Sequence, residues 1–269
     1  MTSDPHVDPV AQRIPPRSTY RLQLGPELSF ATAAQVADYL ADLGVTHVYL
    51  SPILAAAPGS THGYDVIDHA VIDPELGGER GFRSLVETMH AHGLGVILDI
   101  VPNHMAIPVP ESLNHALWAV LRDGRTSEYA AWFDVDWSVG DGRIVVPILD
   151  GSVADNIEHF SIRRRPGEPA TLRYFDHRFP LAEGTADLPL VEALDVQHYR
   201  LVDWRAAATA LNYRRFMDVS TLIGLRVEDP TVFAATHAVV VDLVRGQLVD
   251  GVRVDHPDGL ADPGGYLDA

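Results

Sequence analysis

The sequence predicts an α/β fold with a parallel sheet of the kind found in (β/α) barrels. Apolar strands and helical stripes alternate along the chain, and two of the strands, over 95–101 and 251–255, end in carboxylates and histidines. The chain has 269 residues, of which 46% are apolar, enough to bury a large core. Polar groups at the carboxyl ends of parallel strands are where barrels of this class place their active sites.

The first elements are predicted from alternation and from capping residues. The stretch 18–24 alternates polar and apolar residues as a strand does. Ser29 is a suitable N-cap for a helix that keeps an apolar stripe as far as Leu43 and stops at Gly44. The apolar stretch 45–50 then predicts a second strand. This order is typical of a βαβ crossover.

The same pattern repeats twice more. A helical stripe over 82–92 ends at Gly93 and leads into a strand over 95–101, which is apolar enough to be buried on both faces. Much later, a helix over 231–244 precedes a strand over 251–255. We therefore predict parallel strands joined by helical crossovers.

Four segments follow from this reading. Residues 1–16 are expected to form a loose tail, because they are rich in Pro and Asp and show no periodicity. Residues 17–105 would hold the first three strands and their helices. Residues 106–217 are too many for a plain loop and predict an inserted subdomain that forms one wall of the active-site cleft. Residues 218–269 would hold the third helix and the fourth strand.

Composition excludes several classes of function. The formal net charge of −17 argues against nucleic acid and anionic membranes as partners, since both require basic surfaces. No apolar run is long enough to span a membrane, and no secretory leader is evident, so a cytoplasmic protein is expected. All 20 basic residues are arginine and there is no cysteine, which excludes Schiff-base lysines and thiolate nucleophiles. Carboxylates, histidines and arginines remain for chemistry.

The fourth strand carries the strongest candidate pair. Arg253 and Asp255 lie two residues apart and therefore share one face of the strand. An arginine beside a partly buried carboxylate keeps it ionised, as a carboxylate nucleophile requires. The alternative is a structural pair that only closes the bottom of the barrel.

Two weaker clusters accompany this pair. Asp99 ends the third strand, and Asn103 and His104 follow after a turn, where a capping role is equally compatible with the pattern. In the segment after the second strand, the run His62, Gly63, Tyr64 and Asp65 offers a tyrosine ring that could stack on a sugar. A metal site built on His90 and His92 is disfavoured, because this pair ends a helix and not a strand.

Together these clusters resemble the α-amylase superfamily, glycoside hydrolase family 13. Its D-x-V-x-N-H motif is matched by Asp99, Val101, Asn103 and His104, and its G-x-R-x-D motif by Gly251, Arg253 and Asp255. Within the superfamily, the stretches 16–24, 51–68, 212–237 and 250–263 resemble the maltooligosyltrehalose synthase family of glucan 1-α-glucosylmutases. The resemblance extends over nearly the whole chain.

The resemblance implies roles for these residues. Asp255 would be the nucleophile and Arg253 would keep it charged, while the remaining candidates would bind the sugar in the −1 subsite: His62, Tyr64, Asp65, Asp99, Asn103, His104 and His256. It implies an intramolecular transfer that converts the reducing-end α-1,4 linkage of a maltooligosaccharide into an α,α-1,1 linkage. No cofactor and no metal are implied. Maltooligosaccharides, and a trehalose-releasing hydrolase that acts on the product, are the implied partners.

The chain also departs from the superfamily. The family's general acid and third carboxylate follow later strands, so they are expected beyond Ala269. We therefore expect the N-terminal part, about half, of a (β/α)8 TIM barrel, with a large subdomain inserted after strand 3. An α-1,4-glucan hydrolase or 4-α-glucanotransferase of the same superfamily, and a non-catalytic glucan-binding fragment, remain alternatives.

Overall fold

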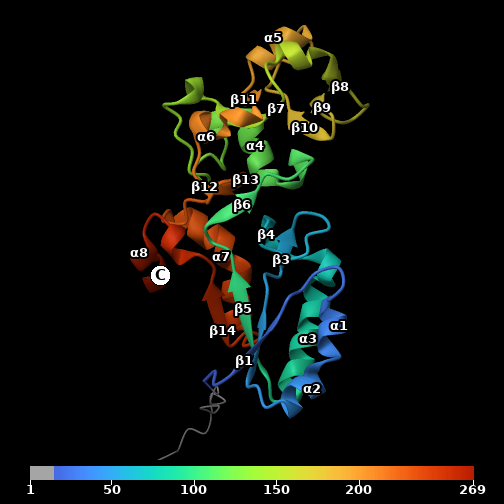
Figure 1. The fold of residues 1–269 in the computed structure, drawn as a ribbon, viewed down its shortest axis with the longest axis vertical. Helices are drawn as coiled ribbons and strands as arrows, with labels where there is room; N and C mark the ends of the chain where they lie inside the picture. Colours follow the sequence, from blue (N-terminus) through green and yellow to red (C-terminus); the bar gives the residue numbers. More distant parts are fainter. Residues whose placement is uncertain (1–14) are drawn as a thin grey trace, which may run out of the picture.

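A four-stranded parallel sheet forms the centre of the lower body of the molecule (Figure 1). In this computed structural model, residues 15–269 are described. The strands lie in the order β1, β2, β5, β14, and each adjacent pair is parallel: β1 (Thr19–Leu22), β2 (His47–Leu50), β5 (Gly95–Ile100) and β14 (Gly251–Val254). The predicted parallel α/β sheet is therefore confirmed. Most of the predicted tail, residues 1–14, lies outside the described residues.

The helices between these strands cover one face of the sheet: α1 (Phe30–Ala34), α2 (Ala37–Asp42), α3 (Gly78–Ala91) and α7 (Pro230–Arg245). Ser29 caps α1, as predicted, by accepting a hydrogen bond from the backbone of Thr32. The single helix expected up to Leu43 is instead two short helices. At the junction, the amides of Gln35 and Val36 bond the carbonyls three residues before them, so the turn tightens and the helix is interrupted.

The two faces of the sheet have different chemistry. Leu22, Val48 and Leu98 point toward the helices and are buried in the first hydrophobic core. The residues between them point to the opposite face, because side chains alternate along a strand. That opposite face carries polar side chains, and the candidate site is built on it.

A short antiparallel hairpin lies above the carboxyl ends of the sheet. It pairs β3 (Leu54–Ala56) with β4 (Val66–Ile72), and its connecting loop carries His62 and Tyr64. The sequence analysis treated this region as a loop. A short helix, α8 (Pro263–Asp268), closes the described chain.

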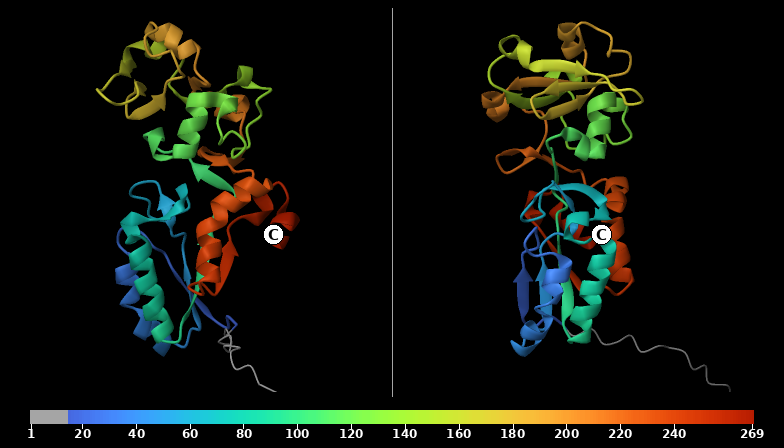
Figure 2. Two further views of the ribbon diagram at one scale, coloured as in Figure 1. Left: turned by 180° about the vertical axis from the view of Figure 1, so that it is seen from behind. Right: turned by 90° about the vertical axis from the view of Figure 1, so that its right-hand side faces the viewer.

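The upper body is seen from two further sides in Figure 2. It has a second hydrophobic core of its own. Its elements are α4 (His115–Asp123), β7 (Ile144–Leu149), β8 (Phe160–Arg163), β9 (Thr171–Tyr174), β10 (His177–Pro180), α5 (Leu190–Asp195), β11 (Tyr199–Asp203) and α6 (Ala207–Ala210). A three-stranded sheet joins the two bodies: β6 (His104–Ala106), β13 (Val219–Gly224) and β12 (Arg215–Phe216). The β12–β13 turn contains Met217, so this hairpin spans the position where the sequence analysis placed the end of the insertion.

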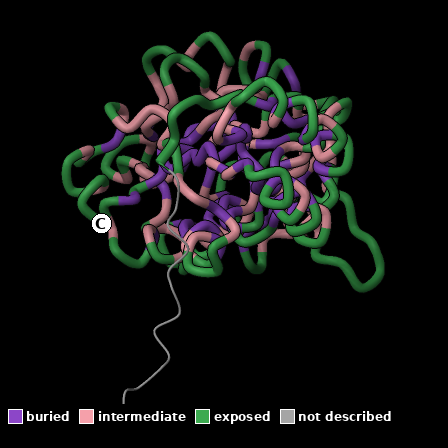
Figure 3. Tube along the Cα trace, turned by 90° about the horizontal axis from the view of Figure 1, so that it is seen from below, coloured by how far each residue is buried: buried purple, intermediate pink, exposed green. Residues whose placement is uncertain are grey.

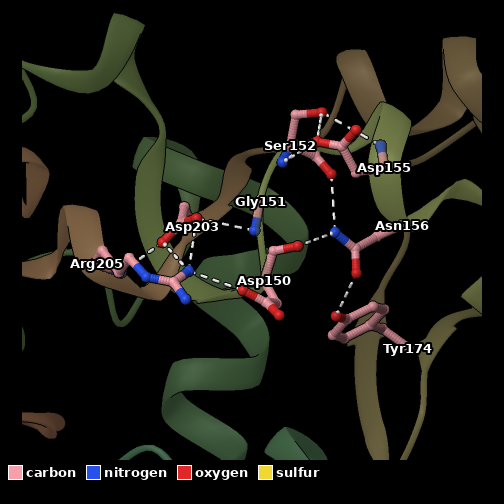
Figure 4. A network of polar contacts seen from close by, with 8 residues as sticks. All are labelled: Asp150, Gly151, Ser152, Asp155, Asn156, Tyr174, Asp203 and Arg205. Carbon is pink, nitrogen blue, oxygen red and sulfur yellow. Dashed lines mark hydrogen bonds and ion pairs between the residues drawn. The ribbon is translucent and has the colours of Figure 1, made fainter.

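Polar contacts fix the loops of the upper body (Figure 4). Arg205 forms ion pairs with Asp150 and Asp203, at the ends of β7 and β11. Asn156 donates to the carbonyl of Asp150 and accepts a hydrogen bond from the Tyr174 hydroxyl, which ties a 3-10 turn to β9. These polar contacts, in addition to apolar packing, hold the loops to the sheets.

Seen from below, buried segments run through the middle of the molecule and exposed segments form its rim (Figure 3). Within residues 15–269, no helix has the length and apolar character needed to cross a membrane. The core of the lower body is the apolar layer between the sheet and its helices.

Candidate active site

A hydrogen-bonded network centres on Asp99 on the polar face of the sheet. The side chain of Asp99 is fully buried and receives a hydrogen bond of 2.9 Å from Nη1 of Arg253. The same nitrogen donates to Asp255 at 2.5 Å. Asp255 comes directly after β14, its side chain lies on the same side of the sheet as that of Arg253, and Arg253 bridges the two carboxylates.

Two tyrosines complete the shell of Asp99. The hydroxyls of Tyr49 and Tyr64 both donate to Oδ2 of Asp99, at 2.6 and 2.5 Å. Arg21 in turn donates to the Tyr64 hydroxyl at 3.0 Å, and its guanidinium lies 5.6 Å from the centre of the Tyr49 ring. The network thus runs across all four strands of the parallel sheet, with the β3–β4 loop contributing Tyr64.

The charges in this network stabilise one another. Partial burial works to lower the pKa of Arg253, but its hydrogen bonds to Asp99 and Asp255 outweigh burial and raise that pKa above its ordinary value. Burial, and then the hydrogen bond to Asp99, raise the pKa of Tyr64, so its hydroxyl remains a donor. The side chain of Asp255 is 18% exposed and that of Asp99 is not exposed at all. Asp255 is therefore the carboxylate of this pair that a ligand can reach.

His104 lies beside the network with a defined tautomer. Its Nε2 is 3.1 Å from the carbonyl oxygen of Tyr64, which can only accept, so Nε2 carries the proton. Nδ1 then accepts from the amide of Asn103 at 3.4 Å. Burial lowers the pKa of His104 to about 4, so the ring is neutral near pH 7. Both ring nitrogens are therefore engaged by protein groups, and the buried ring joins the loop of Tyr64 to Asn103.

His256 follows Asp255 directly and has a left-handed backbone conformation, with φ of 46°. Such a conformation is uncommon outside glycine and holds the side chain in a particular direction. The ring of Phe216, at the tip of the hairpin β12–β13, lies 4.6 Å from His104 and 5.0 Å from His256, measured between ring centres. The hairpin thus contacts two of the three histidines of the predicted site, His104 and His256.

His62 and Asp65 lie at the edge of the cluster. Nδ1 of His62 accepts a hydrogen bond from the amide of Tyr64 and lies 3.6 Å from Asp65. Asp65 accepts a hydrogen bond from Ser60 at 2.5 Å. These two residues shape the loop that carries Tyr64, and Asp65 faces that loop instead of the carboxylate pair.

Sequence reasoning missed four residues of this arrangement: Arg21, Tyr49, Arg214 and Phe216. Arg214 donates to Oδ1 of Asn103 at 2.5 Å and to Asp134 at 2.9 Å, and so joins the strand-end loop to the upper body. Arg21 and Tyr49 could have been found from strand period, because they lie on the same side of their strands as Asp99 does. Arg214 and Phe216 belong to a distant segment, and no local signal identifies them.

The histidine pair His90 and His92 is separate from this network. Nδ1 of His92 bonds the carbonyl oxygen of Thr88 at the end of α3, and His90 lies 3.6 Å from Asp250. Across the described part of the chain, no group of three or more His, Asp or Glu residues is arranged to hold a metal ion. The Asp99 network itself offers a partly exposed carboxylate, Asp255, paired with the guanidinium of Arg253.

Comparison with known proteins matches this geometry to one family. The family model described as the alpha amylase catalytic domain matches residues 33–263. A Mycobacterium tuberculosis protein named putative maltooligosyl trehalose synthase is 48% identical over 257 residues, which is 93% of this chain and 32% of the relative. The chain thus spans about a third of the length of the curated relative.

Solved structures agree in sequence and in fold. Maltooligosyltrehalose synthase from Arthrobacter ramosus aligns with 47% identity and a TM-score of 0.88, covering 94% of this chain and 32% of that one. A hypothetical maltooligosyl trehalose synthase from Sulfolobus tokodaii aligns with 40% identity and a TM-score of 0.82, covering 95% and 33%. The resemblance inferred from the motifs is therefore confirmed.

Proposed function

The chain belongs to the alpha-amylase family, and from that premise we propose that it carries the nucleophile and the −1 subsite of a retaining glucan mutase. The reaction converts the reducing-end α-1,4 linkage of a maltooligosaccharide into an α,α-1,1 linkage, giving maltooligosyltrehalose. The observation that carries the proposal is the partly exposed Asp255, held by Arg253 at the carboxyl end of β14. The names of the relatives support the choice of reaction.

The proposed mechanism has two displacements. An Oδ atom of Asp255 attacks the anomeric carbon in the −1 subsite, the α-1,4 C–O bond breaks, and a general acid protonates the departing oxygen. The released glucose turns, and its anomeric hydroxyl attacks the glucosyl-enzyme while the same acid group takes back the proton. Configuration is retained, Asp255 is released, and no net oxidation occurs.

The neighbours of Asp255 have supporting roles in this proposal. Arg253 keeps the nucleophile ionised, and Asp99 fixes Arg253 while Tyr49 and Tyr64 fix Asp99. His104 holds the backbone of Tyr64 and the side chain of Asn103 through its two ring nitrogens, and so positions the loop beside the −1 subsite. We assign no residue between 15 and 269 as the general acid, because the second carboxylate in this network, Asp99, is buried and fully engaged by donors.

The upper body would control the outcome of the reaction. We propose that the four parallel strands are the first four of a (β/α)8 barrel, and that residues 106–217 form an inserted subdomain beside the cleft. Excluding water from the glucosyl-enzyme separates a mutase from a hydrolase. The Phe216 ring, in contact with His104 and His256, places an apolar surface where water would otherwise approach.

The test is an NMR experiment with maltopentaose on the chain and on a longer polypeptide that contains it. Loss of reducing-end anomeric signals together with a new α,α-1,1 signal is the expected result for the longer polypeptide. Free glucose in its place would indicate a hydrolase, and redistribution of chain lengths would indicate a 4-α-glucanotransferase. Binding of maltopentaose without a product by both polypeptides would refute the mutase and favour a glucan-binding role.

Two variants sharpen this experiment. Asp255→Asn should abolish turnover and retain maltopentaose binding, because the amide cannot form the ester but keeps the size of the side chain. Glu87→Gln, on the exposed side of α3, removes one charge on the opposite face of the sheet and should behave as the parent. Turnover that survives Asp255→Asn would contradict the assignment of the nucleophile.

A further inference from the structure

A basic cavity lies in the upper body, away from the Asp99 network. Its volume is about 540 Å³, within the range of roughly 300 to 1,000 Å³ typical of small-molecule sites. It opens on the outer side of the sheet formed by β8, β9 and β10, whose other side packs into the second core. The cavity is lined by His159, Ser161, Arg163, Arg164, Arg165, Arg173 and Phe175.

The arginines of this cavity repel one another in the described structure. Arg173 lies directly opposite Arg178 in the β9–β10 pairing, and directly opposite Ser161 in the pairing with β8. Like charges placed opposite one another in a sheet are destabilising. Burial, followed by the nearby charges of Arg178, Arg165 and Arg163, lowers the pKa of Arg173. The arrangement therefore raises the energy of the unliganded protein.

Few acceptors compensate for these charges. Arg163 and Arg173 have no carboxylate within 4.0 Å among residues 15–269, and the Nε atoms of Arg173 and Arg178 are buried without a hydrogen-bond acceptor. Arg165 has only an exposed ion pair of 3.8 Å with Glu168. Exposed pairs of this kind contribute little. Arg164 donates to the Ala186 carbonyl and pairs with Asp187, so the unsatisfied donors are those of Arg163 and Arg173. In a chain of net charge −17, such donors are best explained by an anionic ligand.

An exposed aromatic ring lies beside the arginines. Phe175 is 63% exposed and has a left-handed backbone with φ of 50°, a conformation that costs energy for a bulky residue. Its ring lies 4.7 Å from the ring of His159, measured between centres. An exposed apolar ring in a strained conformation, at the rim of a cavity, offers a platform on which a ring of the ligand can stack.

We propose that this cavity binds a phosphate monoester attached to a ring. The guanidiniums of Arg163 and Arg173 would hold the phosphate through paired hydrogen bonds, which match its geometry. Phe175 and His159 would stack on the attached ring, which is either a sugar or a nucleobase. The uncharged glucans of the proposed reaction need no arginine cluster, so this site is separate from the network around Asp99 and independent of the mutase proposal.

Isothermal titration calorimetry in a buffer without phosphate tests the site. The titrants are glucose 6-phosphate, adenosine 5′-monophosphate, inorganic phosphate and glucose. We expect at least one of the two ring esters to bind more tightly than inorganic phosphate, and glucose to show no binding at this site. The preferred ester identifies the ring. Absence of binding by both esters, or equal affinity for the esters and inorganic phosphate, would overturn the proposal.

Three variants separate the roles of the residues. The double substitution Arg163→Gln with Arg173→Gln should weaken ester binding at least tenfold. Phe175→Ser should weaken the esters several-fold and leave inorganic phosphate unchanged, which a merely structural role of Phe175 would not do. The double substitution Arg80→Gln with Arg83→Gln, at two exposed arginines of α3, is the charge-matched control and should bind as the parent. Equal ester affinity in the parent and the double variant would refute the assignment.

Discussion

Replacing Asp99 by asparagine tests the reasoning about the candidate site most directly. The substitution keeps the shape of the side chain but turns one acceptor oxygen into an NH2 donor. Oδ2 of Asp99 accepts from Tyr49 and Tyr64, and Oδ1 accepts from Arg253. The amide offers only one acceptor oxygen. Either the two tyrosine hydroxyls or Arg253 must then face the NH2 group, which cannot accept their hydrogen bonds.

The size of the effect follows from those contacts. With its NH2 group toward Arg253, the amide keeps both tyrosine bonds but makes them to a neutral acceptor; since a hydrogen bond to a charged group contributes about 1.5 to 3 kcal/mol and a neutral one about 1 kcal/mol, the two bonds together weaken by about 2 kcal/mol. The bond from Arg253 adds little, because that side chain is 47% exposed and solvent screens it. For a chain of this size, a loss of about 2 kcal/mol lowers the thermal midpoint by roughly 4 to 8 °C.

Thermal unfolding followed by far-UV circular dichroism measures this shift. Glu87→Gln removes the same charge from an exposed position on α3 and should leave the midpoint unchanged. If Asp99→Asn melts at the same temperature as Glu87→Gln, Asp99 does not hold the two tyrosines and Arg253. The positioning role given to Asp99 would then be wrong.

Three further predictions concern parts of the fold that meet at the site. Burial lowers the pKa of His104 to about 4, so the stability that the neutral ring contributes is complete above about pH 6.5 and is lost as the pH falls through 4. The urea midpoint of the parent should therefore fall across this pH window, and that of His104→Gln should fall less steeply. The charge of Asp255 opposes this shift, while those of Arg214 and His256 reinforce it, so Asp255→Asn should steepen the fall. Arg214→Lys should lose about 2 to 4 kcal/mol by urea titration, since an ammonium cannot bond Asn103, Asp134 and the Leu225 carbonyl together; an unchanged midpoint would contradict this. Asp229→Ala should lower the midpoint in the same titration, because Asp229 caps α7 by accepting from Thr231, and Asp229→Asn should restore most of that loss.

The part of the site that sequence predicts is the part that strand geometry determines. Arg253 and Asp255 are two residues apart in a strand, and period two places them on one face whatever the rest of the chain does. Asp99 ends a neighbouring strand of the same parallel sheet, so its carboxylate had to lie near theirs. Strand order and direction were sufficient for this inference, because parallel strands end at one edge of the sheet.

The remaining residues depend on register and on distant segments. Tyr49 reaches Asp99 only because the β2–β5 register sets Tyr49 beside Ile97, one level below Asp99 on the same face. Packing in the first core fixes the register between the strands. The local sequence of residues 45–50 does not reveal that register. The break between α1 and α2 has the same origin: helical spacing suggested one continuous helix, whereas packing of Phe30 and Leu40 against the sheet accommodates a tightened turn.

The position of Phe216 beside the site is harder to predict than the positions of the site residues on the parallel sheet. The hairpin β12–β13 reaches the two histidines because β13 pairs with β6, the strand that contains His104. That pairing joins segments on either side of the upper body, so the position of Phe216 depends on how the intervening residues fold. Asp99, Arg253 and Asp255 are positioned by the shared parallel sheet. Phe216 belongs to a separate hairpin, whose sequence can vary without disturbing Asp255. In the proposed mutase, substitutions at Phe216 should therefore alter the ratio of transfer to hydrolysis while the nucleophile and Arg253 stay in place.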